Sequence, residues 1–208
     1  MAQITTKPTT MGAKTKEEIK IIQTYFFPEK GCLGPKEMTD AEYDNLLKTR
    51  IQKLNIKQKA LNKLGIDESE VNEIEPVVFE GFNYSGNYML KGIRSSKYEI
   101  TWLFFSDKEM YMYNYIFDMI SSSISERTEE YFYKDITNFS SMTESIEYQY
   151  LGKGSGCGNS TKWEKGSLDS SKFSIIVPGD KFSCSMLNTP DFERKIQGMK
   201  QKLREKKN

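Results

Sequence analysis

The residues that most often carry catalysis are either missing from this sequence or arranged without a catalytic pattern. Histidine is absent from all 208 residues, so no Ser-His-Asp triad, Cys-His pair or HExxH zinc site can form. The glycine-rich stretch Gly152–Gly158 (GKGSGCG) lacks the GxxxxGK[ST] order of a phosphate-binding loop and is typical of a hairpin tip. Cys157, inside that stretch, would need a lysine or a helix N-terminus to activate its thiol. We therefore expect no catalytic residue and no enzymatic activity.

Carboxylates are numerous, but their spacing does not indicate a metal site. Glu129 and Glu130 are adjacent, and neighbouring residues on a strand point to opposite faces. The run Asp67–Glu75 (DESEVNEIE) holds five acids without the spacing or the central glycine of an EF-hand loop, and is typical of a solvated helix face. We expect no metal and no cofactor.

Basic residues gather in two places. Six of them follow one another between Asp44 and Asp67 with no intervening acid: Lys48, Arg50, Lys53, Lys57, Lys59 and Lys63. The simplest interpretation is compensation by the acidic run that follows, and the alternative is an anionic partner such as a membrane or a nucleic acid. Residues 189–208 hold seven Lys/Arg against three Asp/Glu, a net charge of +4. The whole chain has a net charge of only +1, which disfavours nucleic acid as the partner.

Tyr111, Tyr113 and Tyr115 alternate in the segment EMYMYNYIF, so all three lie on one face of a predicted strand. Either the N-terminal helices of the chain cover this tyrosine row, or the row is a surface for a partner. The sequence leaves both alternatives open.

The order of predicted elements places helices first, strands next and one helix last. Residues 1–14 have the composition of a disordered arm. Residues 15–75 form a helical segment, with capping-box patterns at Thr15/Glu18 and Thr39/Glu42 and helical apolar spacing over 39–64. Seven strands are predicted, at 77–84, 98–105, 109–117, 129–139, 145–151, 172–177 and 181–186. This segregated order predicts an α+β fold.

The last predicted helix is amphipathic. Thr189 is a natural N-cap before Pro190, and one apolar stripe follows at spacings of four, three and four residues: Phe192, Ile196, Met199 and Leu203. The cysteines Cys32, Cys157 and Cys184 are odd in number and far apart, which indicates free thiols. No secretory signal pattern is visible at the N-terminus, so we expect a cytoplasmic protein.

Residues 76–208 resemble the bacterial pleckstrin-homology-like (PH-like) proteins. The resemblance rests on the strand-then-helix order, on Tyr133–Thr137 (YKDIT), which is similar to a Y-x-D-I-T strand of that family, and on the final hairpin and helix, FSIIVPGDKF to TPDFERKIQGMKQKL. It implies a seven-stranded antiparallel barrel or sandwich, partly open, with the last helix closing one end. In that superfold the loop between the first strands usually binds headgroups, so the resemblance makes Lys91, Arg94 and Lys97 candidate binding residues.

Together these features predict a non-catalytic PH-like binding or scaffold protein that engages a protein partner. The alternative is peripheral binding to an anionic membrane surface through basic residues. Candidate binding residues are Lys91, Arg94, Lys97 and the tyrosine row. The oligomeric state is left open by the sequence.

Overall fold

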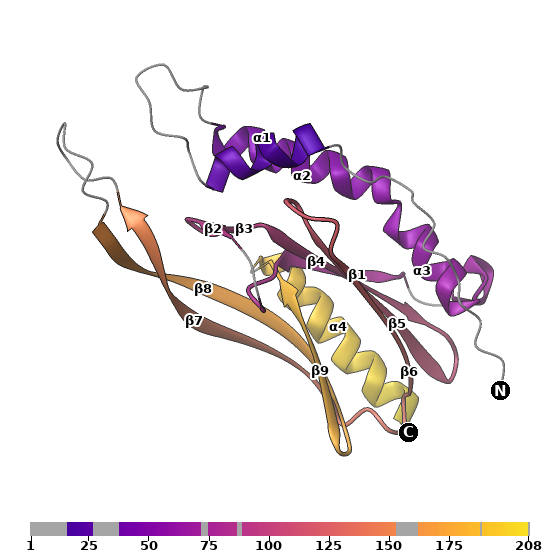
Figure 1. Ribbon diagram of the computed structural model, residues 1–208. Coiled ribbons are helices and arrows are strands. Elements are labelled where there is room, and N and C mark those ends of the chain that lie inside the picture. The colour runs from indigo at the N-terminus through magenta and orange to yellow at the C-terminus, as the bar shows by residue number, and fades with distance from the viewer. Residues whose placement is uncertain are drawn as a thin grey trace, which may run out of the picture.

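The computed structural model describes residues 16–26, 38–71, 75–86, 89–152, 162–187 and 189–207. The N-terminal part holds α1 (Lys16–Phe26), α2 (Asp40–Leu54), α3 (Ile56–Leu64) and the short 3-10 helix η1 (Glu68–Val71). The strands are β1 (Val77–Phe82), β2 (Leu90–Lys91), β3 (Arg94–Ser95), β4 (Lys97–Phe105), β5 (Glu109–Asp118), β6 (Ile124–Phe132), β7 (Asn138–Gly152), β8 (Lys162–Val177) and β9 (Asp180–Met186). The chain ends with α4 (Pro190–Lys207) (Figure 1). The predicted arm at 1–14, Thr15, Cys32, Cys157 and most of the glycine-rich stretch lie outside the described residues.

The strands form three antiparallel sheets, which confirms the predicted α+β class. The larger sheet has the order β1-β4-β5-β6, a second has the order β7-β8-β9, and β2 pairs with β3 in a small hairpin. Within the described residues there are nine strands rather than the seven expected, because β2 and β3 add a two-residue pair around Gly92. The two main sheets face each other without closing into a barrel in the part of the chain that the structure describes.

Two expected elements are wrong in detail. The helix predicted over residues 39–64 is divided at Asn55, which adopts φ 45° and caps α2 by donating its backbone N–H to the carbonyl of Gln52. The strand predicted over 129–139 ends at Phe132 and a turn follows, so the YKDIT segment is not a strand. Its tertiary contacts explain the difference: Ile136 is buried, and the Tyr133 hydroxyl donates to the carbonyl of Ser106, 2.8 Å away.

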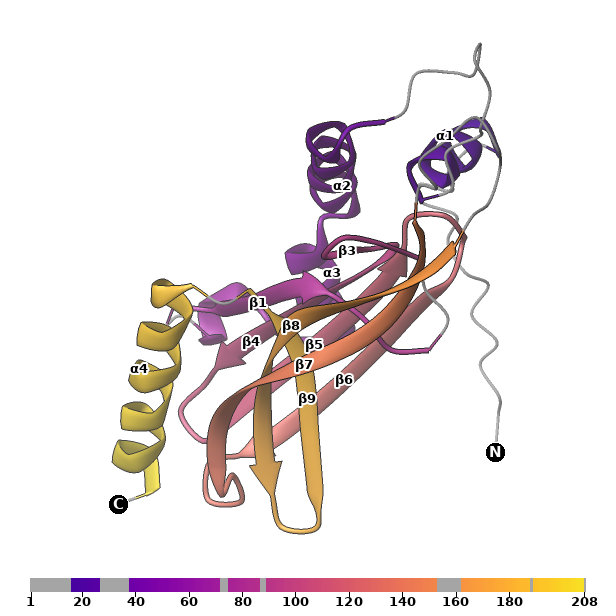
Figure 2. The same cartoon turned by 90° about the vertical axis from the view of Figure 1, so that its left-hand side faces the viewer.

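The two central strands of the larger sheet, β4 and β5, are buried on both faces. Along β5 the residues alternate: Met110 and Met112 face the second sheet, while Tyr113 and Tyr115 face the helices. Residues of both sheets and α4 form the inter-sheet core, and residues of α1, α2 and α3 form a helix–sheet core with β4 and β5. Helices α1, α2 and α3 therefore share a hydrophobic core with the sheet that they cover (Figures 1 and 2).

Helix α4 lies beside the two sheets and contributes to the inter-sheet core (Figure 2). Ile196, Met199 and Leu203 are buried, and the ring of Phe192 stacks on Phe79 of β1 at a centroid distance of 5.6 Å. The apolar stripe predicted for this helix is thereby confirmed. Since this stripe faces the core, the lysines and arginines of α4 lie mainly on its outward side.

The two sheets come closest where β1 approaches β9, and a glycine makes the approach feasible. A Cβ atom at Gly81 would lie 3.2 Å from the Ser185 Cβ and 3.3 Å from the Met186 backbone nitrogen. A Cβ at position 81 would therefore require β9 to shift by a few tenths of an ångström. The turn between β8 and β9 forms as predicted, with Gly179 at φ 83°.

Candidate binding cleft between the two sheets

A cleft of about 410 Å³ lies between the two main sheets. Ligand sites in proteins commonly enclose about 300–1,000 Å³. Residues of both sheets and of the segment after β1 line it: Asn83, Tyr84, Ser85, Glu99, Asn114, Ile116, Ser125, Arg127, Glu144, Ile146, Ser170, Lys172, Phe182, Ser183, Cys184 and Ser185. The lining is dominated by hydroxyl, amide and charged groups, so it fits a polar ligand better than an apolar one.

The inner face of the larger sheet changes from apolar to polar along its strands, and this change creates the cleft. On β4, Leu103 and Phe105 belong to the inter-sheet core, whereas Glu99 on the same face lines the cleft. On β5, Met112 lies in the core and Asn114 lines the cleft. One end of the space between the sheets is therefore filled by apolar side chains and α4, and the other end is polar.

Glu99 is the centre of the polar end, and only 4% of its surface is exposed. Its Oε2 accepts hydrogen bonds from Asn83 Nδ2 at 2.8 Å, from the Ser185 backbone N–H at 3.0 Å and from Ser185 Oγ at 2.7 Å. Its Oε1 accepts one from Asn114 Nδ2 at 2.7 Å. These bonds join β4 and β5 of one sheet to β9 of the other, so the carboxylate positions the two walls of the cleft.

The charged side chains that line the cleft with Glu99 are paired with other residues. Lys172 on β8 donates to Glu144 on β7. Arg127 on β6 donates to Glu129 at 2.8 Å and lies 3.7 Å from Asp180. Each of these cations is thus close to at least one carboxylate other than Glu99.

Two strand edges border the cleft. Strand β6, which supplies Ser125 and Arg127, is the last strand of the larger sheet, and β7, which supplies Glu144 and Ile146, is the last strand of the second sheet. Among the described residues, no further strand pairs with these two edges. An edge of this kind can accept an extended peptide through main-chain hydrogen bonds.

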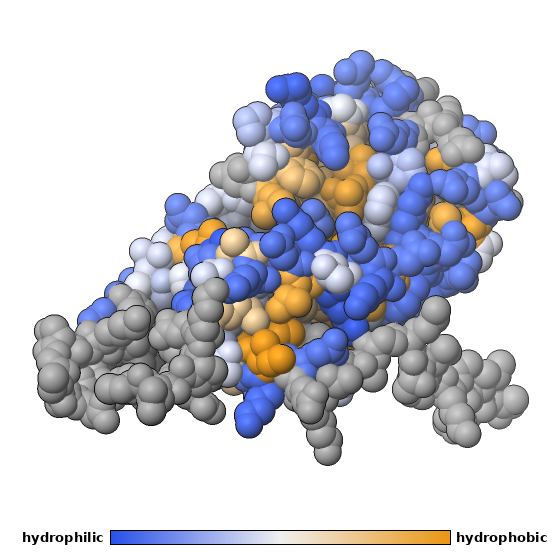
Figure 3. All heavy atoms as spheres, turned by 90° about the horizontal axis from the view of Figure 1, so that it is seen from above, coloured by the Kyte–Doolittle hydropathy of each residue, from blue (hydrophilic) through white to orange (hydrophobic). Residues whose placement is uncertain are grey.

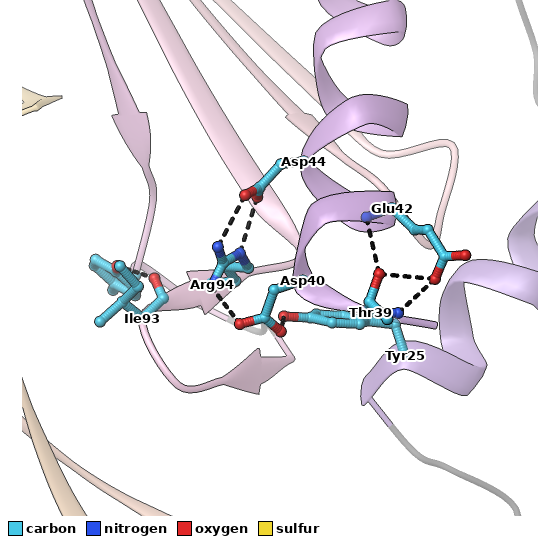
Figure 4. A network of polar contacts seen from close by, with 8 residues as sticks. Tyr25, Thr39, Asp40, Glu42, Asp44, Ile93 and Arg94 are labelled. Carbon is cyan, nitrogen blue, oxygen red and sulfur yellow. Dashed lines mark hydrogen bonds and ion pairs between the residues drawn. The ribbon is translucent and has the colours of Figure 1, made fainter. Parts of the chain in front are cut away.

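Arg94, a candidate headgroup-binding residue from the sequence, is held by two carboxylates of α2 (Figure 4). Its Nε and Nη2 donate to Asp44 and its Nη1 to Asp40, each at 2.8 Å. The Tyr25 hydroxyl of α1 also donates to Asp40, at 2.9 Å. This cluster fastens α1 and α2 to the β2–β3 hairpin, and it compensates the guanidinium charge.

Asp44→Asn is expected to lower the free energy of unfolding by about 1 kcal/mol at neutral pH, because this ion pair is partly exposed and screened by solvent. Hydrogen bonds from Arg94 lower the pKa of the Asp44 carboxyl below its ordinary value of 3.8. The stabilisation is therefore complete above the unfolded-state pKa and is lost as the pH falls through the lower folded-state pKa.

Urea unfolding of wild type and variant from neutral to acidic pH measures this difference. It should stay constant above about pH 5 and shrink at more acidic pH. A difference that grows toward acid would contradict the assignment. Asp169→Asn is the matched control, since Asp169 is exposed on β8.

The other two predicted basic residues lie near the same hairpin. The Lys91 ammonium lies over the ring of Tyr25, 4.4 Å from its centroid. Lys97 Nζ is 3.3 Å from the carbonyl oxygen of Ser85. Lys91 is the register partner of Arg94 in the β2–β3 hairpin, so these two residues lie side by side. The guanidinium of Arg94, however, forms its ion pairs with α2.

The tyrosine row lies under the chain's own helices. Tyr113 and Tyr115 are 0% and 2% exposed, and Lys59 of α3 lies 4.7 Å from the Tyr115 ring centroid. Tyr111, at the end of the row, is half-buried, and its hydrogen bond to Glu109 together with burial raises its pKa to about 12. Figure 3 shows the face of the molecule that carries α1 and α2: it is mostly hydrophilic, with apolar residues visible in its middle.

The basic residues of α2 and α3 are compensated in part within the chain. Lys57 pairs with Glu68 of η1, and Lys63 lies 3.2 Å from Glu126 of β6. The first of these pairs joins the basic helix to the acidic run, as the charge pattern of the sequence predicts.

Sequence reasoning missed Glu99 and the cleft, although a signal was present. Glu99 and Thr101 alternate in the otherwise apolar strand YEITWLFF, and a charge inside such a strand marks either a polar core or a site. Cys184 also borders the cleft, where burial and then the nearby Glu99 charge raise the pKa of its thiol. The thiol therefore stays protonated and is a poor nucleophile.

The described residues contain neither a metal-binding cluster nor a membrane-spanning helix. None of them form a group of three or more His, Cys, Asp or Glu side chains suited to a metal ion. None of the helices that the structure describes is long and apolar enough to cross a membrane.

Comparisons of the chain with protein-family models, with curated proteins and with solved structures found no match.

Proposed function

We propose that this chain is a non-catalytic binding protein of PH-like architecture that engages a protein partner. The architecture is proposed from the order of elements, with two antiparallel sheets followed by a helix whose apolar stripe packs between them. The free buried thiol of Cys184 supports a reducing location such as the cytoplasm. The turn at Tyr133–Asp135 and the open sheets are departures from the expected pattern.

The binding surface that we propose is the polar cleft between β6 and β7. The observation that carries this proposal is a cleft of about 410 Å³ lined by polar groups and bordered by two sheet edges. Polar side chains and unpaired edges together fit an extended segment of a partner, whose main chain needs hydrogen bonds along its length. The tyrosine row is not proposed, because the helices bury it.

Peptides selected from a random display library against the full chain test this function. We expect the selected peptides to lose at least about tenfold in affinity, roughly 1.4 kcal/mol, when Ser125→Tyr fills the cleft mouth. Ser125 is exposed on β6 and lines the cleft, so a larger side chain there need not disturb the core.

Ser141→Tyr is the matched control, because Ser141 is exposed on β7 but does not line the cleft. It should leave peptide affinity unchanged. Failure to select any peptide, or equal binding by the Ser125→Tyr variant, would overturn the proposal.

A second candidate function is peripheral binding to an anionic membrane. The observation that favours it is the outward side of α4, where exposed cations gather: Arg194, Lys195, Lys202, Arg204 and Lys207. Flotation with vesicles of phosphatidylcholine, with and without phosphatidylserine, distinguishes the two functions. Binding only to the anionic vesicles, persisting at physiological salt, supports the membrane function, and no binding at low or physiological salt excludes it.

A further inference from the structure

The buried carboxylate at the floor of the cleft has no cationic partner among the described residues. All four hydrogen bonds that Glu99 accepts come from neutral donors: two amide side chains, one backbone N–H and one hydroxyl. No ion pair between described residues includes Glu99. Carboxylates are rarely buried to this degree without a counter-ion, because removing a charge from water is costly.

The other charges of the cleft do not supply this counter-ion. Lys172 is hydrogen-bonded to Glu144, and Arg127 lies within ion-pair distance of Glu129 and Asp180. Because each of these cations is already paired with a carboxylate of its own, the charge of Glu99 has no counter-ion among the described residues. The field at the floor of the cleft therefore favours a cation.

The hydrogen-bonding geometry of Glu99 leaves room for a further donor. Oε2 accepts three hydrogen bonds, whereas Oε1 accepts one, from Asn114. Each carboxylate oxygen has about two acceptor positions, and among the described residues only one of the two on Oε1 is used. Serine hydroxyls that line the same cleft, at Ser85, Ser125 and Ser170, can accept hydrogen bonds from an ammonium or a guanidinium.

We propose that the cleft receives a cationic side chain, the ammonium of a lysine or the guanidinium of an arginine, with Glu99 as its counter-ion. This inference rests on the proposed function, since the cation belongs to the extended segment of the partner. It adds a specificity: the segment carries a basic residue at the position that reaches the floor of the cleft.

The test uses the full chain and three small probes: the N-acetyl methylamides of lysine, of arginine and of norleucine. Norleucine keeps most of the lysine stem and lacks the charge. We expect saturable shifts of the side-chain amide resonances of Asn83 and Asn114 with at least one charged probe. The norleucine probe should bind at least about tenfold more weakly.

The Glu99→Gln variant should reduce binding of the charged probe at least about tenfold, and Glu130→Gln should leave it unchanged. Glu130 is the matched control because it is exposed on β6 and does not line the cleft. Backbone amide spectra show whether the Glu99→Gln variant is folded. The comparison of the lysine and norleucine probes uses only the wild-type protein, so it remains a test even if the Glu99→Gln variant does not fold.

Equal binding of the neutral probe, absence of binding by both charged probes, or unchanged binding in folded Glu99→Gln would overturn this inference. The display experiment separates it from the proposed function. If the selected peptides require an open cleft but need no basic residue, the binding function is supported and the proposed cationic specificity is contradicted. Failure to select any peptide would remove the function itself.

Discussion

Replacing Glu99 by alanine is expected to lower the free energy of unfolding by about 3 kcal/mol. The substitution removes the acceptor of four hydrogen bonds and leaves the donors on Asn83, Asn114 and Ser185 without it. These donors lie in the polar region where the two sheets meet, so the loss of their hydrogen bonds to Glu99 weakens the contact between β4 and β9. Removing the buried charge returns some desolvation free energy, which keeps the expected loss well below the sum over four bonds.

Thermal and urea unfolding measure this effect. A loss of this size lowers the melting temperature of a chain of this length by roughly 6–12 °C. Glu130→Ala removes the same side chain from an exposed position on β6 and should change stability by less than about 0.5 kcal/mol. Equal stability of Glu99→Ala and wild type would show that the carboxylate does not join the sheets.

Replacing Tyr43 by alanine is expected to cost about 3–5 kcal/mol, the range seen when a buried aromatic ring is removed. Tyr43 is 0% exposed, and its ring stacks on Tyr25 at a centroid distance of 4.5 Å. Its hydroxyl donates to the backbone carbonyl of Ser95 at 2.8 Å. One residue of α2 thus contacts α1 through its ring and the β2–β3 hairpin through its hydroxyl.

Tyr43→Phe separates these two contributions, because it keeps the ring and removes the hydrogen bond. It should cost about 1 kcal/mol. Leu46→Ala, at a position 40% exposed on the same helix, is the control for α2 and should cost less than about 1 kcal/mol. If Tyr43→Ala were as stable as Leu46→Ala, the helices would not share the core of the sheet.

This second prediction bears on the division of the chain. The sequence suggested a helical segment, 15–75, followed by a PH-like part, 76–208. The helix–sheet core joins Leu47 of α2 and Leu61 of α3 to Tyr113 and Tyr115 of β5. Removing the helices would therefore expose the apolar face of β4 and β5 that they cover.

Elements that depend on neighbouring residues could be predicted from the sequence. The capping box of Thr39 and Glu42 forms, and the Pro178–Gly179 turn joins two strands. The apolar stripe of α4 is buried at Ile196, Met199 and Leu203. Each of these signals lies within a few residues of chain, where backbone geometry and side-chain spacing decide the outcome.

Elements that depend on distant residues could not be predicted in this way. The segment YKDIT has the composition of a strand, yet Tyr133 bonds to Ser106 and Ile136 enters the inter-sheet core, so the chain turns there. The sequence left two alternatives for the tyrosine row: cover by the chain's own helices, or a surface for a partner. The packing of α3 on β5 decides between them. Local preference yields to tertiary contacts when the two compete.

The sequence by itself determined the α+β class, the order of helices and strands, and the absence of any histidine-dependent chemistry. Only the tertiary structure decided what the charged residues do. Arg94 is held by Asp44, fifty positions earlier, and Glu99 joins Ser185, eighty-six positions later. Such pairings arise because the fold brings distant strands and helices together, and the free energy of a charge depends on which groups surround it there.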